Sequence, residues 1–328
     1  MTYKIGPVEL ENNVMLAPMA GVTDRPFRQL VRSFGVGLVV SEMIASRAMI
    51  YANKKTMRMS TACADEFPMS VQLAGTEPEV ISEAAKMNED RGAAILDLNM
   101  GCPAKKVVNG YSGSALMKDE VLAGKIMQAA VDAVSMPVTL KMRTGWDADN
   151  RNAPNLARIA EESGIQSIVV HGRTRQQMYK GHSDWAFIGK VKEAVSLPVT
   201  GNGDVNSIDD AKKMFEQSNT DGVMIGRGAY GKPWFPSQVA HFLKTGERLD
   251  DPDLQQKLDT ILIHYDAMLS HYGKELGMRN MRKHIGWYSK GLPNSAEFRQ
   301  TVFGCNEADQ VPDLIKAFFA PLIDQRAA

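Results

Sequence analysis

Short apolar runs, rich in β-branched residues, recur along the first two thirds of the chain and alternate with amphipathic stretches. Runs of this kind that end at Gly, Pro or polar residues predict buried strands, and the stretches between them predict helices. Eight strand–helix units in succession predict an α/β fold, a (β/α)8 TIM barrel. The predicted strands are residues 14–20, 38–43, 69–74, 95–100, 137–143, 167–173, 198–204 and 222–228.

The alternative α/β architecture is a doubly wound sheet that binds a dinucleotide. It would contain fewer strands, and a glycine-rich turn would follow the first of them. Residues 16–24 read LAPMAGVTD, which is not that turn, so the sequence favours the barrel. The first helix is predicted to begin with Thr23 or Asp24 as its N-cap and Pro26 just inside.

The pattern changes after Trp234, where the β periodicity ends. Residues 247–256 are acidic, contain Pro252 and are interpreted as a linker. From Leu258 onward the apolar residues follow helical spacing, which predicts a small all-helical domain. We therefore expect two domains, a barrel over residues 1–245 and a helical domain over residues 246–328.

Composition and cysteine placement exclude several classes of protein. The 328 residues are 44% apolar and 23% charged, which is ordinary for a soluble protein. No apolar run approaches the roughly 20 residues that span a bilayer, and no export signal is visible at the N-terminus. Cys63, Cys102 and Cys305 lie far apart, which argues against disulfides, a zinc site or an iron–sulfur cluster. We expect a cytoplasmic protein without a metal or a membrane partner.

Basic and acidic residues are equal in number over the whole chain, but they are unevenly distributed along it. The formal net charge is zero, so there is no overall electrostatic attraction to nucleic acid. Residues 24–58 nevertheless contain seven basic and two acidic side chains. These are Arg25, Arg28, Arg32, Arg47, Lys54, Lys55 and Arg58 against Asp24 and Glu42.

The longest connection in the predicted barrel follows the fourth strand and carries Gly101-Cys102-Pro103. Long barrel loops are more often functional than structural. A cysteine thiol is mostly protonated at neutral pH and can donate a proton. A lone cysteine is more often a small buried side chain. The position of Cys102 just past a strand end, after Asn99 and before two lysines, favours a functional role.

Polar groups follow nearly every predicted strand, at the face where barrel enzymes carry their active sites. Glu42 and Arg173, each taken alone, are interpreted as turn caps or surface charges. The glycine loops at 201–204 and 226–228, with Arg227, predict a phosphate site after the last two strands. Together with Gln72, Lys141 and the backbone of residues 17–20, this phosphate site would fit flavin mononucleotide (FMN) lying across the barrel mouth. A lysine near the pyrimidine end of the flavin would stabilise its anionic reduced form.

The segments LAPMAGVTDRPFR, VQLAG, DLNMGCPAKK, LKMRTGW, VVHGRTR, GNGD and MIGRG occur in this order. Together they resemble the tRNA-dihydrouridine synthases, most of all the DusB branch, and the resemblance covers the whole chain. Two mild departures are Gly201, where relatives more often carry alanine, and the variable residues 110–112. Neither touches the residues that carry the expected chemistry.

The resemblance implies an FMN enzyme that reduces the C5–C6 double bond of particular uridines in tRNA, with NADPH as the reductant. It implies Cys102 as the proton donor, and it places Asn99 and Arg143 where they would read a flipped base. The residues implied to bind FMN are Pro18, Met19, Ala20, Gln72, Lys141, His171, Asn202, Gly203, Asp204, Gly226 and Arg227.

The same resemblance gives the helical domain a role in binding tRNA. Arg279, Arg282 and Lys283 have the spacing of one helix face and, with the basic segment 25–58, are candidate phosphate contacts. Without the resemblance this face would be interpreted as an ordinary solvated one. We expect a monomer.

Two rival functions remain open on the sequence. The first is a flavin barrel that acts on a small molecule, such as a dihydroorotate or dihydropyrimidine dehydrogenase, which leaves the helical domain without a role. The second is an RNA-binding or regulatory protein on an inactive barrel, for which the Cys102, Lys141 and His171 set would have no use.

Overall fold

The computed structural model describes residues 3–51, 56, 59, 60 and 66–327. The expectations for Lys54, Lys55, Arg58 and Cys63 concern residues outside these ranges. Eight parallel strands form a closed ring, in which each strand pairs with the next along the chain and the first pairs with the last. They are β3(Val14–Leu16), β4(Leu38–Val40), β6(Met69–Ala74), β7(Ile95–Met100), β8(Val138–Arg143), β9(Ser167–His171), β10(Val199–Asn202) and β11(Gly222–Ile225). The predicted (β/α)8 barrel is confirmed.

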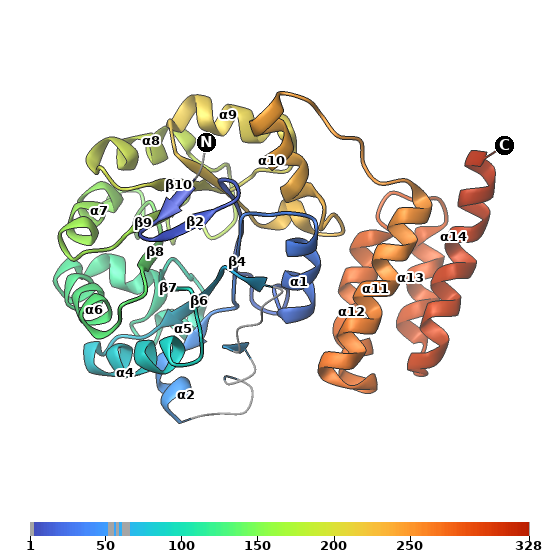
Figure 1. Ribbon diagram of the computed structural model, residues 1–328, viewed down its shortest axis with the longest axis horizontal. Coiled ribbons are helices and arrows are strands. Elements are labelled where there is room, and N and C mark those ends of the chain that lie inside the picture. The colour runs from blue at the N-terminus through green and yellow to red at the C-terminus, as the bar shows by residue number, and fades with distance from the viewer. Residues whose placement is uncertain (1–2, 52–55, 57–58, 61–65, 328) are drawn as a thin grey trace.

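Helices cover the outside of the ring (Figure 1). They are α1(Arg25–Ser33), α2(Ser46–Ile50), α4(Pro78–Glu89), α6(Glu120–Ala133), α7(Ala153–Glu162), α8(Trp185–Ala194), α9(Ile208–Ser218) and α10(Phe235–Thr245). The predicted N-cap of α1 is confirmed, because the Asp24 carboxylate accepts the N–H of Phe27 and Pro26 lies in the first turn. Capping of this kind satisfies N–H groups that the helix itself cannot.

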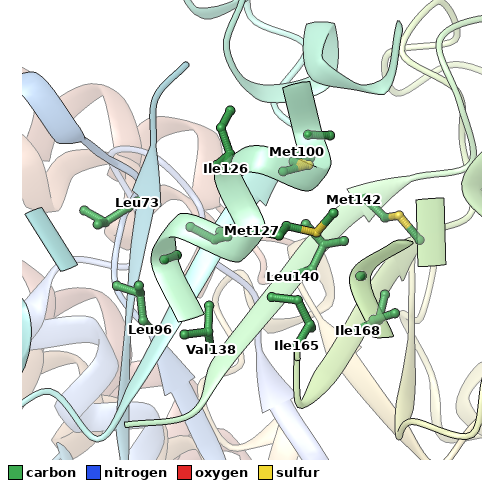
Figure 2. Packing of buried hydrophobic residues seen from close by; sticks show 14 of the residues in the cluster. Leu73, Leu96, Met100, Ile126, Met127, Val138, Leu140, Met142, Ile165 and Ile168 are labelled. Carbon is green, nitrogen blue, oxygen red and sulfur yellow. The ribbon is translucent and has the colours of Figure 1, made fainter. Parts of the chain in front are cut away.

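Alternate residues of each strand face opposite sides of the ring. On β7 and β8, Leu96, Leu98 and Leu140 join the apolar cluster between strands and helices, and Figure 2 shows Ile126 and Met127 of α6 packed in the same cluster. The intervening residues, among them Asp97, Asn99, Thr139, Lys141 and Arg143, point the other way. This alternation puts polar groups inside the upper barrel while the apolar ones fix the helices.

Three features of the barrel were not predicted. A hairpin of β1(Tyr3–Ile5) and β2(Val8–Leu10) packs against the barrel interior, where the Tyr3 hydroxyl lies 2.8 Å from that of Thr200. A short strand β5(Ile44–Ala45) pairs with β6. Between β7 and α6 the chain forms α5(Lys105–Val108) and the 3-10 helix η2(Gly113–Lys118).

The last part of the chain is helical, as predicted. It contains α11(Leu254–Tyr272), α12(Lys274–Tyr288), α13(Ser295–Gly304), the 3-10 helix η4(Ala308–Gln310) and α14(Val311–Ala327). These helices share an apolar core of their own and lie beside α1 and α10 (Figure 1). Helix α11 begins inside the predicted linker, because Asp253 and Gln256 form a capping box. No helix among the described residues is long and apolar enough to cross a membrane.

Of the four basic residues of the segment 25–58 that the structure describes, Arg28, Arg32 and Arg47 make contacts within the protein. Arg28 is buried and forms an ion pair with Glu66 at 2.6 Å. Arg32 donates to the carbonyls of Val36 and Phe67, and Arg47 pairs with Glu77. The expectation that Arg28 contacts RNA phosphates is therefore wrong, because its charge is already compensated away from solvent.

Replacing Arg28 by Met is expected to lower the free energy of unfolding by about 3–5 kcal/mol, because it removes one member of a buried ion pair. Urea denaturation of Arg28→Met measures the change. The matched control is Arg47→Met, which breaks an exposed pair with Glu77 and should change the free energy of unfolding much less, because solvent screens an exposed pair. An equal loss of unfolding free energy in the two variants would contradict the assignment of Arg28 and Glu66 as a buried, stabilising ion pair.

Candidate active site at the carboxyl end of the barrel

A cavity of about 440 Å³ opens at the carboxyl ends of the barrel strands. Its volume lies in the range of small-molecule and cofactor sites. The cavity brings together every residue that the sequence analysis expected to bind the cofactor, and also Asn99, Cys102 and Arg143. The expected cofactor residues on its lining are Pro18, Met19, Ala20, Gln72, Lys141, His171, Asn202, Gly203, Asp204, Gly226 and Arg227.

One end of the cavity is formed by Gly203, Asp204 and Arg227. Gly203 has a φ of +118°, and a Cβ there would lie 2.8 Å from the His171 ring. Only glycine fits at this position. The Asp204 carboxylate accepts from Arg173 at 2.6 Å and from Arg227 at 3.2 Å. Two guanidinium groups around one carboxylate leave this end with a net positive charge.

Arg173 is buried rather than a surface charge, which corrects its interpretation from sequence alone. Besides Asp204 it donates to the carbonyls of Lys180 and Gly181. Burial disfavours the charged Asp204 carboxylate, but the hydrogen bonds from Arg173 and from the Ser183 N–H outweigh it and lower its pKa. Asp204 therefore holds the two arginines in place as an anion. The turn-cap reading of Glu42 is confirmed, since Glu42 accepts the Gly21 N–H at 2.6 Å.

Lys141 and His171 lie in the middle of the cavity lining, on neighbouring strands. The Lys141 ammonium donates to the Asn202 side chain at 3.1 Å. Burial and the nearby Arg143 charge lower the pKa of Lys141 to about 8. Burial and the charges of Arg143 and Lys141 hold the pKa of His171 well below 6.5, so its imidazole is neutral at physiological pH.

The opposite end of the cavity holds Cys102, whose main chain is fixed by a chain of buried hydrogen bonds. The Asp97 carboxylate accepts from Thr139 at 2.7 Å and from the Gln72 amide at 2.6 Å. Gln72 accepts from Asn99 at 2.8 Å, and the Asn99 oxygen accepts the N–H of Cys102 at 2.9 Å. Three neighbouring strands thus determine where the thiol lies.

Arg143 holds the same loop from another side. Its Nε donates to the Gly101 carbonyl at 2.7 Å, and a terminal N–H group donates to the carbonyls of Thr174 and Met178. These contacts join the loop after β7 to the loop after β9. They also put a buried positive charge next to the Cys102 thiol.

Several residues of this site are not predicted from the sequence. Tyr179 and Tyr230 line the cavity, and the Tyr179 ring lies between the guanidinium groups of Arg143 and Arg227, at 5.5 and 5.4 Å. No local pattern marks these two tyrosines. Asp97 could have been found, because it is a carboxylate flanked by leucines within an apolar strand.

The three basic residues expected on one face of the helical domain all lie in α12, but each has a different partner. Arg279 is exposed and pairs with Glu275 at 2.9 Å. Arg282 donates to the Cys305 carbonyl within the helical domain, and Lys283 donates to the Gly21 carbonyl of the barrel. None of the three lines the cavity described above.

Comparison with known proteins places the chain in context. The model of the dihydrouridine synthase (Dus) family matches residues 15–321. A probable tRNA-dihydrouridine synthase of Rickettsia bellii is 58% identical, over 98% of this chain and 99% of the relative. The tRNA-dihydrouridine synthase B of Xanthomonas axonopodis pv. citri is 48% identical, over 98% of this chain and 96% of the relative.

Solved structures share the fold at low sequence identity. Histamine dehydrogenase from Rhizobium sp. 4-9 matches with a TM-score of 0.59 and 14% identity, over 81% of this chain and 50% of that chain. Morphinone reductase matches with a TM-score of 0.52 and 13% identity, over 78% of this chain and 93% of that chain. These two likenesses support the barrel fold alone.

Replacing Asn99 by Ala is expected to loosen the Cys102 loop, because it removes the acceptor of the Gly101 and Cys102 N–H groups. In a background with Cys63 and Cys305 changed to Ser, the rate at which maleimide alkylates Cys102 should rise. The control is Asn109→Ala, at an exposed position of the same connection. An unchanged alkylation rate in Asn99→Ala would show that Asn99 does not hold the loop.

Proposed function

This chain belongs to the dihydrouridine synthase family, and we propose that it reduces the C5–C6 double bond of particular uridines in tRNA to give 5,6-dihydrouridine. The observation that carries the proposal is the single cavity that contains an anion-binding end, a buried lysine and a cysteine at the opposite end. We further propose FMN as the cofactor and NADPH as the reductant.

The residues of the cavity suit FMN. The glycine loops after β10 and β11, with Arg227, would hold the phosphate, and Pro18 to Ala20 would hold one edge of the ring system. The Lys141 ammonium has three N–H donors, and one of them is used on Asn202. Donors remain for the electron-rich pyrimidine end of the flavin. When bound and reduced, FMN supplies the hydride for C6 of the uracil.

Cys102 completes the reduction by donating its proton to C5. The new C–H bond at C5 forms as the S–H bond breaks, and the thiolate left behind is compensated by the buried Arg143 guanidinium. Solvent then returns a proton to the sulfur. Asn99 and Arg143 frame the side of the cavity where the base would lie, and we propose that both contact it. Their hydrogen bonds to the Cys102 loop give them a second, positioning role.

The uracil must leave its stack to reach the cavity, so we propose a flipped or unpaired nucleotide as the substrate. The helical domain, residues 246–328, would bind the rest of the tRNA. Arg279 is exposed enough to contact a phosphate, while Arg282 and Lys283 would contribute positive potential from their present positions. We propose that the protein works as a monomer in the cytoplasm.

Purified protein is expected to carry a yellow flavin chromophore, and Cys102→Ala should retain that chromophore and NADPH oxidation but lose dihydrouridine formation in tRNA. The physical reason is that, without the thiol, no acid is in place to protonate C5 when the hydride is transferred to C6. Mass spectrometry of tRNA from a deletion strain complemented with each variant measures the product. Cys305→Ala is the control and should behave as wild type. Normal dihydrouridine levels in the Cys102→Ala strain would remove the thiol from the mechanism, and a colourless protein that does not take up FMN would exclude the proposed function.

The affinity of the apoprotein for FMN is expected to fall as the pH rises through about 8. Burial and Arg143 lower the pKa of Lys141 to about 8, so the ammonium is mostly charged at pH 7 and mostly neutral at pH 9.5. Only the charged form attracts the flavin edge. Titrations with FMN between pH 7 and 9.5 measure this, and Lys141→Met should bind more weakly with little pH dependence. The same pH dependence in Lys141→Met and wild type would show that Lys141 is not its source.

A further inference from the structure

Helix α12 of the helical domain contacts two barrel loops that form one side of the cavity. The Trp287 indole stacks on the Tyr230 ring with centroids 4.0 Å apart and planes 10° apart. One helical turn earlier, the Lys283 ammonium donates to the Gly21 carbonyl. The two loops follow β3 and β11, which are adjacent strands, so α12 reaches one continuous part of the cavity rim.

The loop after β3 is held from both sides at Gly21. Pro18, Met19 and Ala20, which come directly before it, line the cavity. The Gly21 N–H is bound by Glu42 of the barrel at 2.6 Å, and its carbonyl is bound by Lys283 of the helical domain. The wall formed by residues 18–20 therefore ends at a residue that the helical domain helps to fix.

The loop after β11 meets α12 still more closely. Tyr230 lines the cavity next to the predicted phosphate loop at 226–228. Gly231 has a φ of +67°, and a Cβ there would lie 2.5 Å from the Trp287 carbonyl oxygen. Glycine is required here because the two main chains are in contact. The Tyr230 ring thus lines the cavity and stacks on Trp287, which is not part of the lining.

We propose that Trp287 and Lys283 are positioning residues for the flavin site, so that the helical domain supports the cavity wall even when no RNA is bound. The proposal rests on the proposed function, because it takes FMN to be the ligand of the cavity. It assigns to α12 a role that binding of tRNA phosphates does not require. Because binding free energies are reciprocal, RNA contacts that shift α12 would alter flavin affinity by the same factor as flavin alters RNA affinity.

The test is the FMN affinity of the apoprotein, followed by quenching of flavin fluorescence without RNA. Trp287→Ala should raise the FMN dissociation constant by about threefold to tenfold, the range expected for loss of one aromatic stack. It should also change the visible circular dichroism of the bound flavin. Trp287→Phe, which can still stack on Tyr230, should restore both.

A matched control is available within the helical domain. Phe298 and Phe318 stack with centroids 4.0 Å apart and planes 8° apart; Phe298 belongs to the core of the helical domain, and Phe318 packs against it. Phe318→Ala should lower thermal stability and leave the FMN dissociation constant at the wild-type value. A rise in that constant equal to the rise in Trp287→Ala would overturn the proposal, because general loosening of the domain would then explain both.

Substitution of Lys283 provides a second test of the proposal, which remains valid even if the Trp287→Ala variant does not fold. Lys283→Met should raise the FMN dissociation constant, whereas Lys274→Met, which removes an exposed ion pair with Asp309 at the start of the same helix, should not. If Trp287→Ala and Lys283→Met bind FMN as wild type does and only raise the KM for tRNA, α12 is an RNA contact and the inference is wrong. If the wild-type apoprotein itself fails to bind FMN, the proposed function fails instead.

Discussion

A buried carboxylate organises the upper half of the barrel. Asp97 lies on the inward side of β7 and accepts hydrogen bonds from Gln72 on β6 and Thr139 on β8. Burial raises the pKa of Asp97, while these two hydrogen bonds and the Lys141 charge oppose that shift. A charge is tolerated inside a protein only with compensation of this kind. The same bonds fix Gln72 and, through Asn99, the main chain of Cys102.

Above Asp97 the cavity separates two kinds of chemistry. The end of the cavity around Asp204 is positive because Arg173 and Arg227 share the single carboxylate of that residue. Its other end has the thiol, placed beside a guanidinium whose hydrogen bonds are made to main-chain carbonyls. His171 stands between the two ends as a neutral ring. Positive charge is thus held at fixed positions before a ligand enters, which is the arrangement that electrostatic catalysis needs.

The helical domain is connected to this cavity rather than merely attached to the barrel. The resemblance to the dihydrouridine synthases suggested that a basic face of this domain binds RNA, and the structure divides those residues among different partners. Arg282 stays within its own domain, and Lys283 reaches the barrel loop at Gly21. With the Trp287–Tyr230 stack, these contacts make the shape of the cavity rim depend on residues far from it in sequence.

Local sequence patterns were sufficient for the barrel strands and for the residues at their carboxyl ends. A buried strand needs several consecutive apolar positions, and parallel strands closed into a barrel bring their carboxyl ends to one rim, so Gln72, Lys141 and His171 could be placed together before any coordinates. The three-residue strands of the N-terminal hairpin carry no such periodicity and were missed. The basic character of Arg28 was equally misleading, since nothing local shows that Glu66 compensates it.

By itself, therefore, the sequence determined the fold class, the order of the elements and the polar side chains at the carboxyl ends of the strands, because those depend on period and spacing along the chain. Only the tertiary structure decided which charges neutralise one another, what holds the Cys102 main chain, and that Trp287 supports Tyr230. Those are contacts between residues far apart in sequence, and their energies depend on burial and on distances that no local pattern encodes.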